Sequence, residues 1–367
     1  MAGENQVMNP IGISRLGASN LGADKDALFL KVFSGEVLQV FEENNALLPL
    51  VRQRTISSGK SAQFPVTGVA TAKYHTPGES IMASGTDESS PADGVLDTSK
   101  YLTQMKHTER VISIDGMLVS SAFIGDIDEA KNHYDVRSAY STQIGRELAY
   151  HADRALIRTC IAGARKVDDR FGGSDAKFLG AQVALDTDSP ADGVQGDEIV
   201  TGLFTVAQKM DEASVPSDGR YCILTPANYY KLLNTADDNV LRAINRDFGN
   251  EGNGSVARGE VVQVAGLRIL KSNHIPTANE SSTQDAVFGD DLINNDVFTS
   301  DGGYSGANFT ATEGICFQTE GLGTVKLLDL AMESEYQLDR LGTLMVAKYA
   351  MGHGILREEC LFELTTA

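Results

Sequence analysis

Apolar residues recur at helical spacing in two stretches of this chain. In the first, from about Asp26 to Glu43, one face carries Phe29, Val32, Phe33, Val37, Val40 and Phe41. The second stretch, residues 128–163, has an apolar stripe of Tyr140, Ile144, Leu148, Ala152, Ala155, Leu156 and Cys160, with charged residues on its other sides. Both patterns predict amphipathic helices, because positions three and four residues apart share one helix face. The second helix would be roughly 50 Å long, from the rise of 1.5 Å per residue.

Residues 52–112 predict a long β-hairpin, because polar and apolar residues alternate in two arms. The first arm runs from Arg52 to His75, and the second, Tyr101 to Asp115, contains the strand-like run Arg110–Ile114. Between them, residues 76–100 are polar and rich in turn-forming residues. The first arm has few large apolar residues, which indicates a hairpin that projects from the body rather than a buried strand.

The region from 195 to 330 mixes both spacings. The expected elements are a helix over Glu198–Ala213, a short buried strand at Tyr221–Leu224, a helix from Pro226 through Leu233, and strands around Val261–Val264 and Leu267–Leu270. A Gly/Asp/Asn-rich stretch follows over 278–306, and Val325–Leu364 is typical of strands. Helices and strands are therefore interspersed, and the predicted fold class is α+β.

Composition narrows the function classes. The net charge is −19, with 50 acidic and 31 basic residues, whereas a protein that grips nucleic acid through phosphates needs basic surface. No stretch approaches the roughly 18 apolar residues of a membrane helix, and residues 1–24 lack a signal-peptide pattern. We therefore expect no membrane association and a chain that stays in the cytoplasm where it is made. The four cysteines, Cys160, Cys222, Cys316 and Cys360, are widely spaced and are expected to be buried and reduced.

Three kinds of catalytic or binding motif are each incomplete in this sequence. Ser58-Gly59-Lys60-Ser61 matches the end of a phosphate-binding loop, but Arg54 stands where that motif needs glycine, and a strand is expected to follow. Asp186-Thr187-Asp188 begins like a calcium loop, but Pro190 occupies a ligand position. No His/Cys spacing fits zinc. We predict no catalytic residues, no cofactor and no metal.

Four strings of residues resemble the major capsid proteins of T-seven-like short-tailed bacteriophages. They are Ser58–Val66, Lys106–Asp115, Asn132–Ser138 and Ala347–Gly354. The order of predicted parts also resembles the capsid fold of tailed phages named after phage HK-ninety-seven. That resemblance implies an N-arm (1–51), an extended hairpin loop (52–112), a peripheral domain (113–195 and 325–367) with a spine helix at 128–163, and an axial domain (196–324).

The resemblance also implies a function and partners. The expected function is a major capsid protein that self-assembles into hexamers and pentamers of an icosahedral head. Assembly is expected in the host cytoplasm around a scaffolding protein, with a portal at one vertex and later expansion. The shell would enclose double-stranded DNA without sequence-specific binding, with a triangulation number of seven, and a decoration protein is left open.

The candidate inter-subunit residues lie mostly on the hairpin. Its arms are basic and its tip is acidic, which would suit a neighbouring subunit with acidic surface. The candidates are Arg52, Arg54, Lys60, Lys73, Glu79, Lys100, Lys106 and Arg110, with Arg137 and Gly145 on the long helix. The alternative is a solvated hairpin. Gly145 would serve as a bend or as a close helix contact, since glycine in a helix interior costs about 1 kcal/mol relative to alanine.

Two departures and two alternatives accompany the resemblance. The resembled proteins predict Leu-Arg-Pro-Glu-Ala after Gly354-Ile355, where this chain has Leu356-Arg357-Glu358-Glu359-Cys360, and the hairpin tip over 82–97 is longer than expected. A cellular encapsulin would share the fold but package an enzyme. An ordinary soluble enzyme would run as a compact monomer or small oligomer.

Overall fold

The computed structural model describes residues 47–68, 70, 72, 74–75, 77–78, 81, 107–125, 137–167, 178–185, 195–233, 263–281, 292–295, 297–298 and 303–366. The predicted helix at Asp26–Glu43, the arm before it and nearly all of the hairpin tip lie outside these residues. Among the described helices, none is long and apolar enough to cross a membrane.

A six-stranded mixed sheet forms one lobe, with strand order β5-β12-β9-β6-β8-β7. The strands are β5 (Ala181–Leu185), β6 (Arg220–Leu224), β7 (Gln263–Val264), β8 (Leu267–Lys271), β9 (Thr312–Gln318) and β12 (Leu361–Thr366). The central strands β6, β9 and β12 are buried almost throughout. Only β6 shows this in the sequence as a short apolar run, Tyr221–Leu224, because β9 and β12 also bury polar residues such as Thr312 and Glu363.

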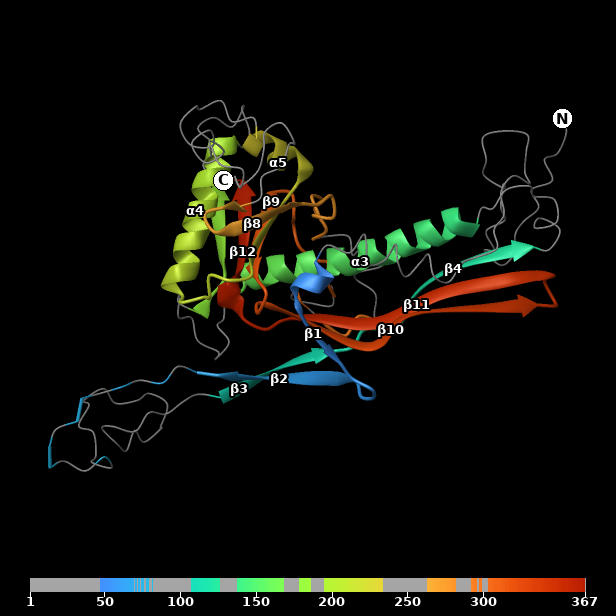
Figure 1. Ribbon diagram of the computed structural model, residues 1–367, viewed down its shortest axis with the longest axis horizontal. Helices are drawn as coiled ribbons and strands as arrows, with labels where there is room; N and C mark the ends of the chain where they lie inside the picture. The colour runs from blue at the N-terminus through green and yellow to red at the C-terminus, as the bar shows by residue number, and fades with distance from the viewer. Residues whose placement is uncertain are drawn as a thin grey trace, which may run out of the picture.

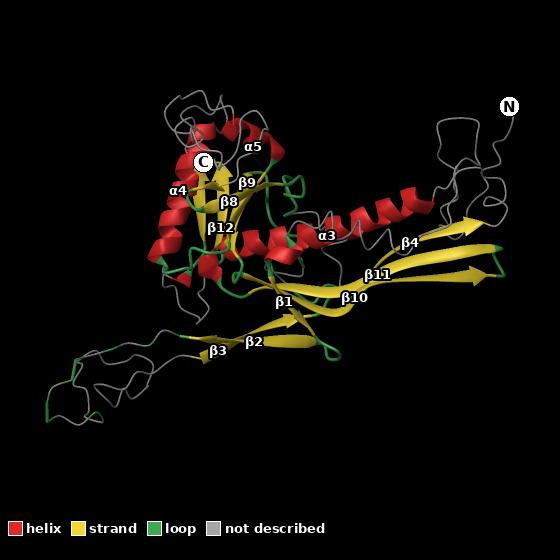
Figure 2. Cartoon of the chain, in the orientation of Figure 1, coloured by secondary structure: helices red, strands yellow, loops and turns green. Residues whose placement is uncertain are grey.

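Two helices belong to this lobe. Helix α4 (Gly196–Glu212) begins with a capping box in which the Gln195 amide N–H donates to the carboxylate of Glu198 at 2.8 Å. Its apolar face, including Ile199 and Leu203, packs in one core with residues of β5, β6 and β12. Helix α5 (Pro226–Leu233) follows β6 directly. In Figure 2 both helices lie at the outer side of this lobe.

A second sheet of four strands has the order β1-β10-β11-β4. Its strands are β1 (Arg52–Thr55), β4 (Leu118–Gly125), β10 (Leu322–Gln337) and β11 (Gly342–Ile355). The long β10–β11 hairpin extends away from the six-stranded lobe, alongside β4 (Figure 1). Before β1, the short 3-10 helix η1 (Leu48–Leu50) carries Leu47 and Leu48 into the core.

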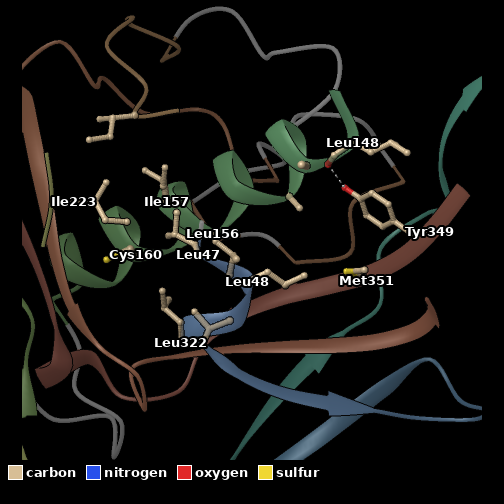
Figure 3. Packing of buried hydrophobic residues seen from close by; sticks show 14 of the residues in the cluster. Leu47, Leu48, Leu148, Leu156, Ile157, Cys160, Ile223, Leu322, Tyr349 and Met351 are labelled. Atoms are coloured by element: carbon tan, nitrogen blue, oxygen red, sulfur yellow. Dashed lines mark hydrogen bonds between the residues drawn. The ribbon is translucent and has the colours of Figure 1, made fainter. Parts of the chain in front are cut away.

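Helix α3 (Arg137–Arg165) is a 29-residue rod that contacts both sheets. Its stripe of Leu148, Leu156 and Cys160 packs against residues of η1, β6, β10 and β11, as Figure 3 shows. The Tyr349 hydroxyl on β11 donates to the Leu148 carbonyl at 3.4 Å. The helix thus joins the six-stranded lobe to the long hairpin.

Most predicted elements in the described part of the chain are confirmed within a few residues. The helix predicted at 128–163 is α3, which ends two residues later, at Arg165; residues 128–136 lie outside the described range. The helices at 198–213 and 226–233 and the strands of the C-terminal region are also confirmed. All four cysteines are free and buried, as expected. A strand, not a helix, follows Ser58–Lys60, which removes the phosphate-loop reading.

The first arm of the predicted hairpin is wrong over Arg52–Thr55. These residues form β1, which pairs in parallel with β10, and the Ile56 amide extends that pairing by donating to the Lys326 carbonyl at 2.9 Å. The chain then turns through Gly59, whose φ of +113° is accessible to glycine. The hairpin proper starts at Ser61, because this turn redirects the chain from one sheet to another.

The hairpin itself consists of β2 (Ser61–Thr67) and β3 (His107–Ser113), paired residue for residue from Ser61 opposite Ser113 to Thr67 opposite His107. The few large apolar residues of the first arm predicted a strand that is not buried, and near the body one of its faces is nevertheless buried. Ala62 and Phe64 are buried, and the strand alternates exposed and buried positions. Even with few large apolar residues, a strand can bury one face.

Leu156→Ala should lower the free energy of unfolding by about 2–5 kcal/mol, because it leaves a cavity in the core under α3. Leu156 is 0% exposed. Leu338→Ala is the matched control, since Leu338 is 79% exposed in the β10–β11 turn and should change stability by less than about 0.5 kcal/mol. Denaturant titration of both variants checks this; equal losses would contradict the packing described.

Candidate functional site: the hairpin root

The hairpin root, defined as Ser61–Phe64 and Arg110–Ser113, is where the hairpin meets the body. Here β2 and β3 lie across the four-stranded sheet (Figure 1). A small apolar cluster holds them there, made of Ala62, Phe64, Ile112, Ile114, Val325, Ala350 and Leu356. The far end of the hairpin does not share this cluster. Val111, on the opposite side of β3, is 51% exposed.

Glycines on β10 and β11 let the root approach closely. A Cβ at Gly352 would lie 1.9 Å from the Ser113 carbonyl oxygen, and one at Gly354 would lie 2.8 Å from Cγ1 of Ile112. Neither distance is compatible with a side chain. We call the surface of β10 and β11 under the hairpin root the seat; it consists of Gly352, Gly354 and the apolar residues Val325 and Ala350. Because the seat presents backbone and apolar atoms, its contacts with the hairpin have little directional preference.

Two asparagines from the Gly/Asp/Asn-rich stretch supply directional bonds. The Asn295 side chain accepts from the Ser113 amide at 3.0 Å and donates to the Ser113 carbonyl at 2.7 Å. The Asn294 side chain donates to the Ile114 carbonyl at 2.7 Å. These side chains satisfy backbone groups as a neighbouring strand would. A segment expected from its composition to be an irregular loop therefore completes the root.

Asp115, directly after β3, lies in a buried polar cluster with Tyr304 and His353. The Tyr304 hydroxyl donates to Asp115 Oδ2 at 2.6 Å and accepts from the His353 amide at 3.0 Å. Burial raises the pKa of Asp115 to about 6, against the lowering effect of its hydrogen bonds. Burial, reinforced by Lys326, lowers the pKa of His353 to about 4. At neutral pH the histidine is neutral and the carboxyl is largely ionised.

An ion pair links strand β3 of the hairpin to the C-terminal part of the body. The Arg110 guanidinium on β3 donates to Glu358 Oε1, and Lys166 Nζ lies 3.0 Å from the same oxygen. Glu358 belongs to the 3-10 turn η3 (Glu358–Cys360), and its side chain is 0% exposed. The next residue, Glu359, is also buried but pairs with Arg357 at 2.9 Å.

The sequence-predicted candidates are placed as follows. Arg52, Arg54 and Lys60 are exposed, and Arg54 donates to the Gln63 carbonyl at 2.7 Å while lying 5.7 Å from the centre of the Phe64 ring. Arg110 is opposite Phe64 in the ladder. The structure therefore brings Arg54 and Arg110 together at the root.

The other candidates belong to α3 or fall outside the described residues. Gly145 is buried within α3, far along the chain from the root. Arg137 begins α3, and its side chain is outside the described part. Lys73, Glu79, Lys100 and Lys106 also lie outside the described residues.

Sequence reasoning missed the buried charges along α3. Asp153 and Arg158, among the charged residues opposite the apolar stripe, are fully buried. Asp153 accepts from the Leu47 amide at 3.2 Å, and Arg158 bonds Glu280 at 2.5 Å. Arg165 bonds the buried Glu363 of β12 at 2.6 Å. Nothing in the local sequence signals these pairs, because each partner lies more than 100 positions away.

In the described part of the chain, no three His, Cys, Asp or Glu side chains gather as a metal site. The polar groups of the root are used in holding elements together. What the arrangement offers is a two-stranded arm attached to the body at its root, which is suited to contact with another molecule.

Comparison with known proteins agrees with this picture. A family model described as "Gp10A-like: Major capsid protein" matches residues 63–365. The major capsid protein of Escherichia phage T7 is 32% identical over 346 residues, covering 92% of this chain and 91% of the relative. That of Enterobacteria phage T3 is 33% identical over 365 residues, covering 94% and 92%.

Solved structures show the same likeness. The capsid structure of the cyanophage P-SCSP1u has a TM-score of 0.67 and 38% identity, covering 96% of this chain and 98% of that one. The mature capsid of bacteriophage PhiM1 has a TM-score of 0.63 at 19% identity, covering 97% of both chains, and supports the fold alone.

Opposite pH dependences should appear when Asp115 and His353 are replaced separately. An acid with a raised pKa contributes stability that is present below about pH 4 and lost as pH rises through about 6. A histidine with a lowered pKa contributes stability that is present above 6.5 and lost as pH falls through about 4. In the native chain the two contributions oppose each other between pH 4 and 6.

Asp115→Asn should therefore gain stability relative to the native chain between pH 4 and 7, by up to about 3 kcal/mol. His353→Gln should lose a similar amount of stability relative to the native chain as the pH rises over the same range. Denaturant titrations at half-unit pH steps measure both differences. Difference curves that do not change with pH would contradict these assignments.

Proposed function

The chain belongs to the Gp10A-like major capsid protein family, and on that premise we propose how it builds its shell. It is a phage head protein with the tailed-phage capsid fold. We propose that hexamers and pentamers of this chain close around a scaffolding protein and later expand as double-stranded DNA is packed. The observation that carries the proposal is the 38% identity to a cyanophage capsid over 96% of this chain.

The proposed inter-subunit contact is the hairpin. Its root is fixed to its own body, while Val111 is exposed and Arg52, Arg54 and Lys60 lie exposed close to the root. A neighbouring copy, with a net charge of −19, supplies acidic surface for these basic residues. The four-part division into N-arm, extended loop, peripheral and axial domains belongs to the same proposal.

The six-stranded sheet contains strands from both the peripheral and the axial part. β5 and β12, assigned to the peripheral part, are in the same sheet as β6, β8 and β9 of the axial part. Neighbouring strands share backbone hydrogen bonds, so the two parts would move as one body at this sheet. Expansion would then act at the hairpin and between subunits.

The remaining partners are also proposals. They are a portal at one vertex, packaged DNA held without sequence-specific contacts, and assembly in the host cytoplasm. The strongly negative charge supports a wall that does not grip the polymer. The family is one of structural capsid proteins, and we propose no enzymatic activity. Membership of a phage family favours this reading over a cellular encapsulin, which would package an enzyme.

Deleting residues 81–99 through a short Gly-Ser link should give a folded chain that forms no stable shells. The segment has only Ile81, Met82, Val95 and Leu96 as sizeable apolar residues, so it contributes little apolar burial to its own subunit. Closing the shortened loop changes the chain entropy little. Circular dichroism should match the native chain, and electron microscopy after co-expression with the scaffolding protein should find particles absent or unstable on mild heating.

The native chain co-expressed in the same way is the control and should form closed shells. Native-like shells from the deletion variant would assign the inter-subunit contact to another part of the surface. Failure of the native chain to form particles would overturn the proposed assembly itself.

A further inference from the structure

The turn η3 contains Glu358, a buried carboxylate in a segment where the sequence departs from the resembled capsid proteins. Glu358 is fully buried, and its Oε1 is shared by two cations from different elements: Arg110 on β3 and Lys166 just after α3. The cations are partly exposed, at 23% and 35%, whereas the carboxylate is 0% exposed. A buried carboxylate is stable only with such partners. The hairpin, the end of the long helix and η3 are therefore tied at one atom.

The bonds from Asn294 and Asn295 hold β3 only where it enters the body, at Ser113 and Ile114, and the apolar contacts of the root do not by themselves define the direction of the hairpin. The seat is apolar and glycine-lined, and such contacts are not directional. A charge-assisted hydrogen bond, in contrast, prefers a narrow range of distance and angle. The seven paired residues of β2–β3 extend about 20 Å at 3.3 Å per residue, so a tilt of about 10° at the root would move their far end by about 3 Å. A small change at Arg110 is thus amplified along the hairpin.

We infer that Glu358 is the positioning residue for the hairpin: its buried carboxylate, bonded to Arg110 and Lys166, fixes the direction in which the hairpin leaves the subunit. This inference rests on the proposed function in that the hairpin reaches a neighbouring copy. Neutralising Glu358 frees the hairpin to tilt on its apolar seat while the ladder between β2 and β3 stays intact.

Hydrogen exchange in the full-length, unassembled chain separates tilting from unfolding. The amides of Ser113 and Asp115 bond to the body, at Asn295 and Met351, whereas the β2–β3 ladder lies within the hairpin. In Glu358→Gln, exchange over 113–116 should rise about tenfold, since local opening sets the exchange rate. Exchange over 107–112 and in β9 and β12 should stay at the native rate.

Glu359→Gln is the matched control. Glu359 is the adjacent residue, is also buried at 1% exposure, and pairs with Arg357 instead of the hairpin. It should leave exchange over 113–116 at the native rate. An unchanged rate in Glu358→Gln, or an equal rise in Glu359→Gln, would overturn the inference. A uniform rise over 107–116, β9 and β12 would also overturn it, because it would show general destabilisation.

Arg110→Gln provides a second route should Glu358→Gln fail to fold, and must by itself raise exchange over 113–116. Where both single variants fold, the double variant should exchange no faster than Glu358→Gln alone, because that substitution already breaks the bond to Arg110. Additive effects would count against the inference. Electron microscopy of assembled particles then tests the link to function, with shells of irregular size expected from Glu358→Gln. If the native chain formed no shells, the proposed function would fail while the exchange result would stand.

Discussion

Charge buried along α3 is the constraint on which the arrangement of the other elements depends. A buried ion without a partner costs several kcal/mol, so each charged residue on the hidden side of the helix requires a matching group at a fixed place. Asp153 requires the Leu47 amide, Arg158 requires Glu280, and Arg165 requires Glu363. Each pair attaches a different part of the chain to the helix. The carboxylates have further partners as well: Asp153 contacts His274, Glu280 contacts Arg154, and Glu363 accepts from Thr312.

Apolar packing supplies most of the stability in such an arrangement but little of its orientation. The clusters under α3 and in the six-stranded lobe exclude water over large areas. Leucine and isoleucine surfaces nevertheless tolerate small relative shifts. The ion pairs and the asparagine bonds at the hairpin root fix the angles. A subunit that must repeat its geometry many times in a closed shell depends on such fixed angles.

The hairpin root illustrates how both effects combine. Gly352 and Gly354 bring the strand close enough for Ile112 and Ser113 to pack on the sheet. Contact at that distance is available only to glycine, so the seat is specified by the absence of side chains. Direction then comes from polar groups that surround the seat, including Asn295 and Glu358. Shape and charge thus act on the same few residues.

The sequence by itself determined the elements that depend on local pattern. The helical spacing of apolar residues predicted α3, and strand-like segments rich in apolar residues predicted β6 and the C-terminal strands. Both signals lie within a few neighbouring residues of the chain. It also indicated the family through long matching strings. Only the tertiary structure decided that Arg52–Thr55 pairs with β10, and that Glu358 is buried against Arg110. Those contacts join positions separated by more than 200 residues, and two adjacent glutamates look the same in sequence whether they are solvated or buried. Their meaning depends on which distant partner the fold brings within reach.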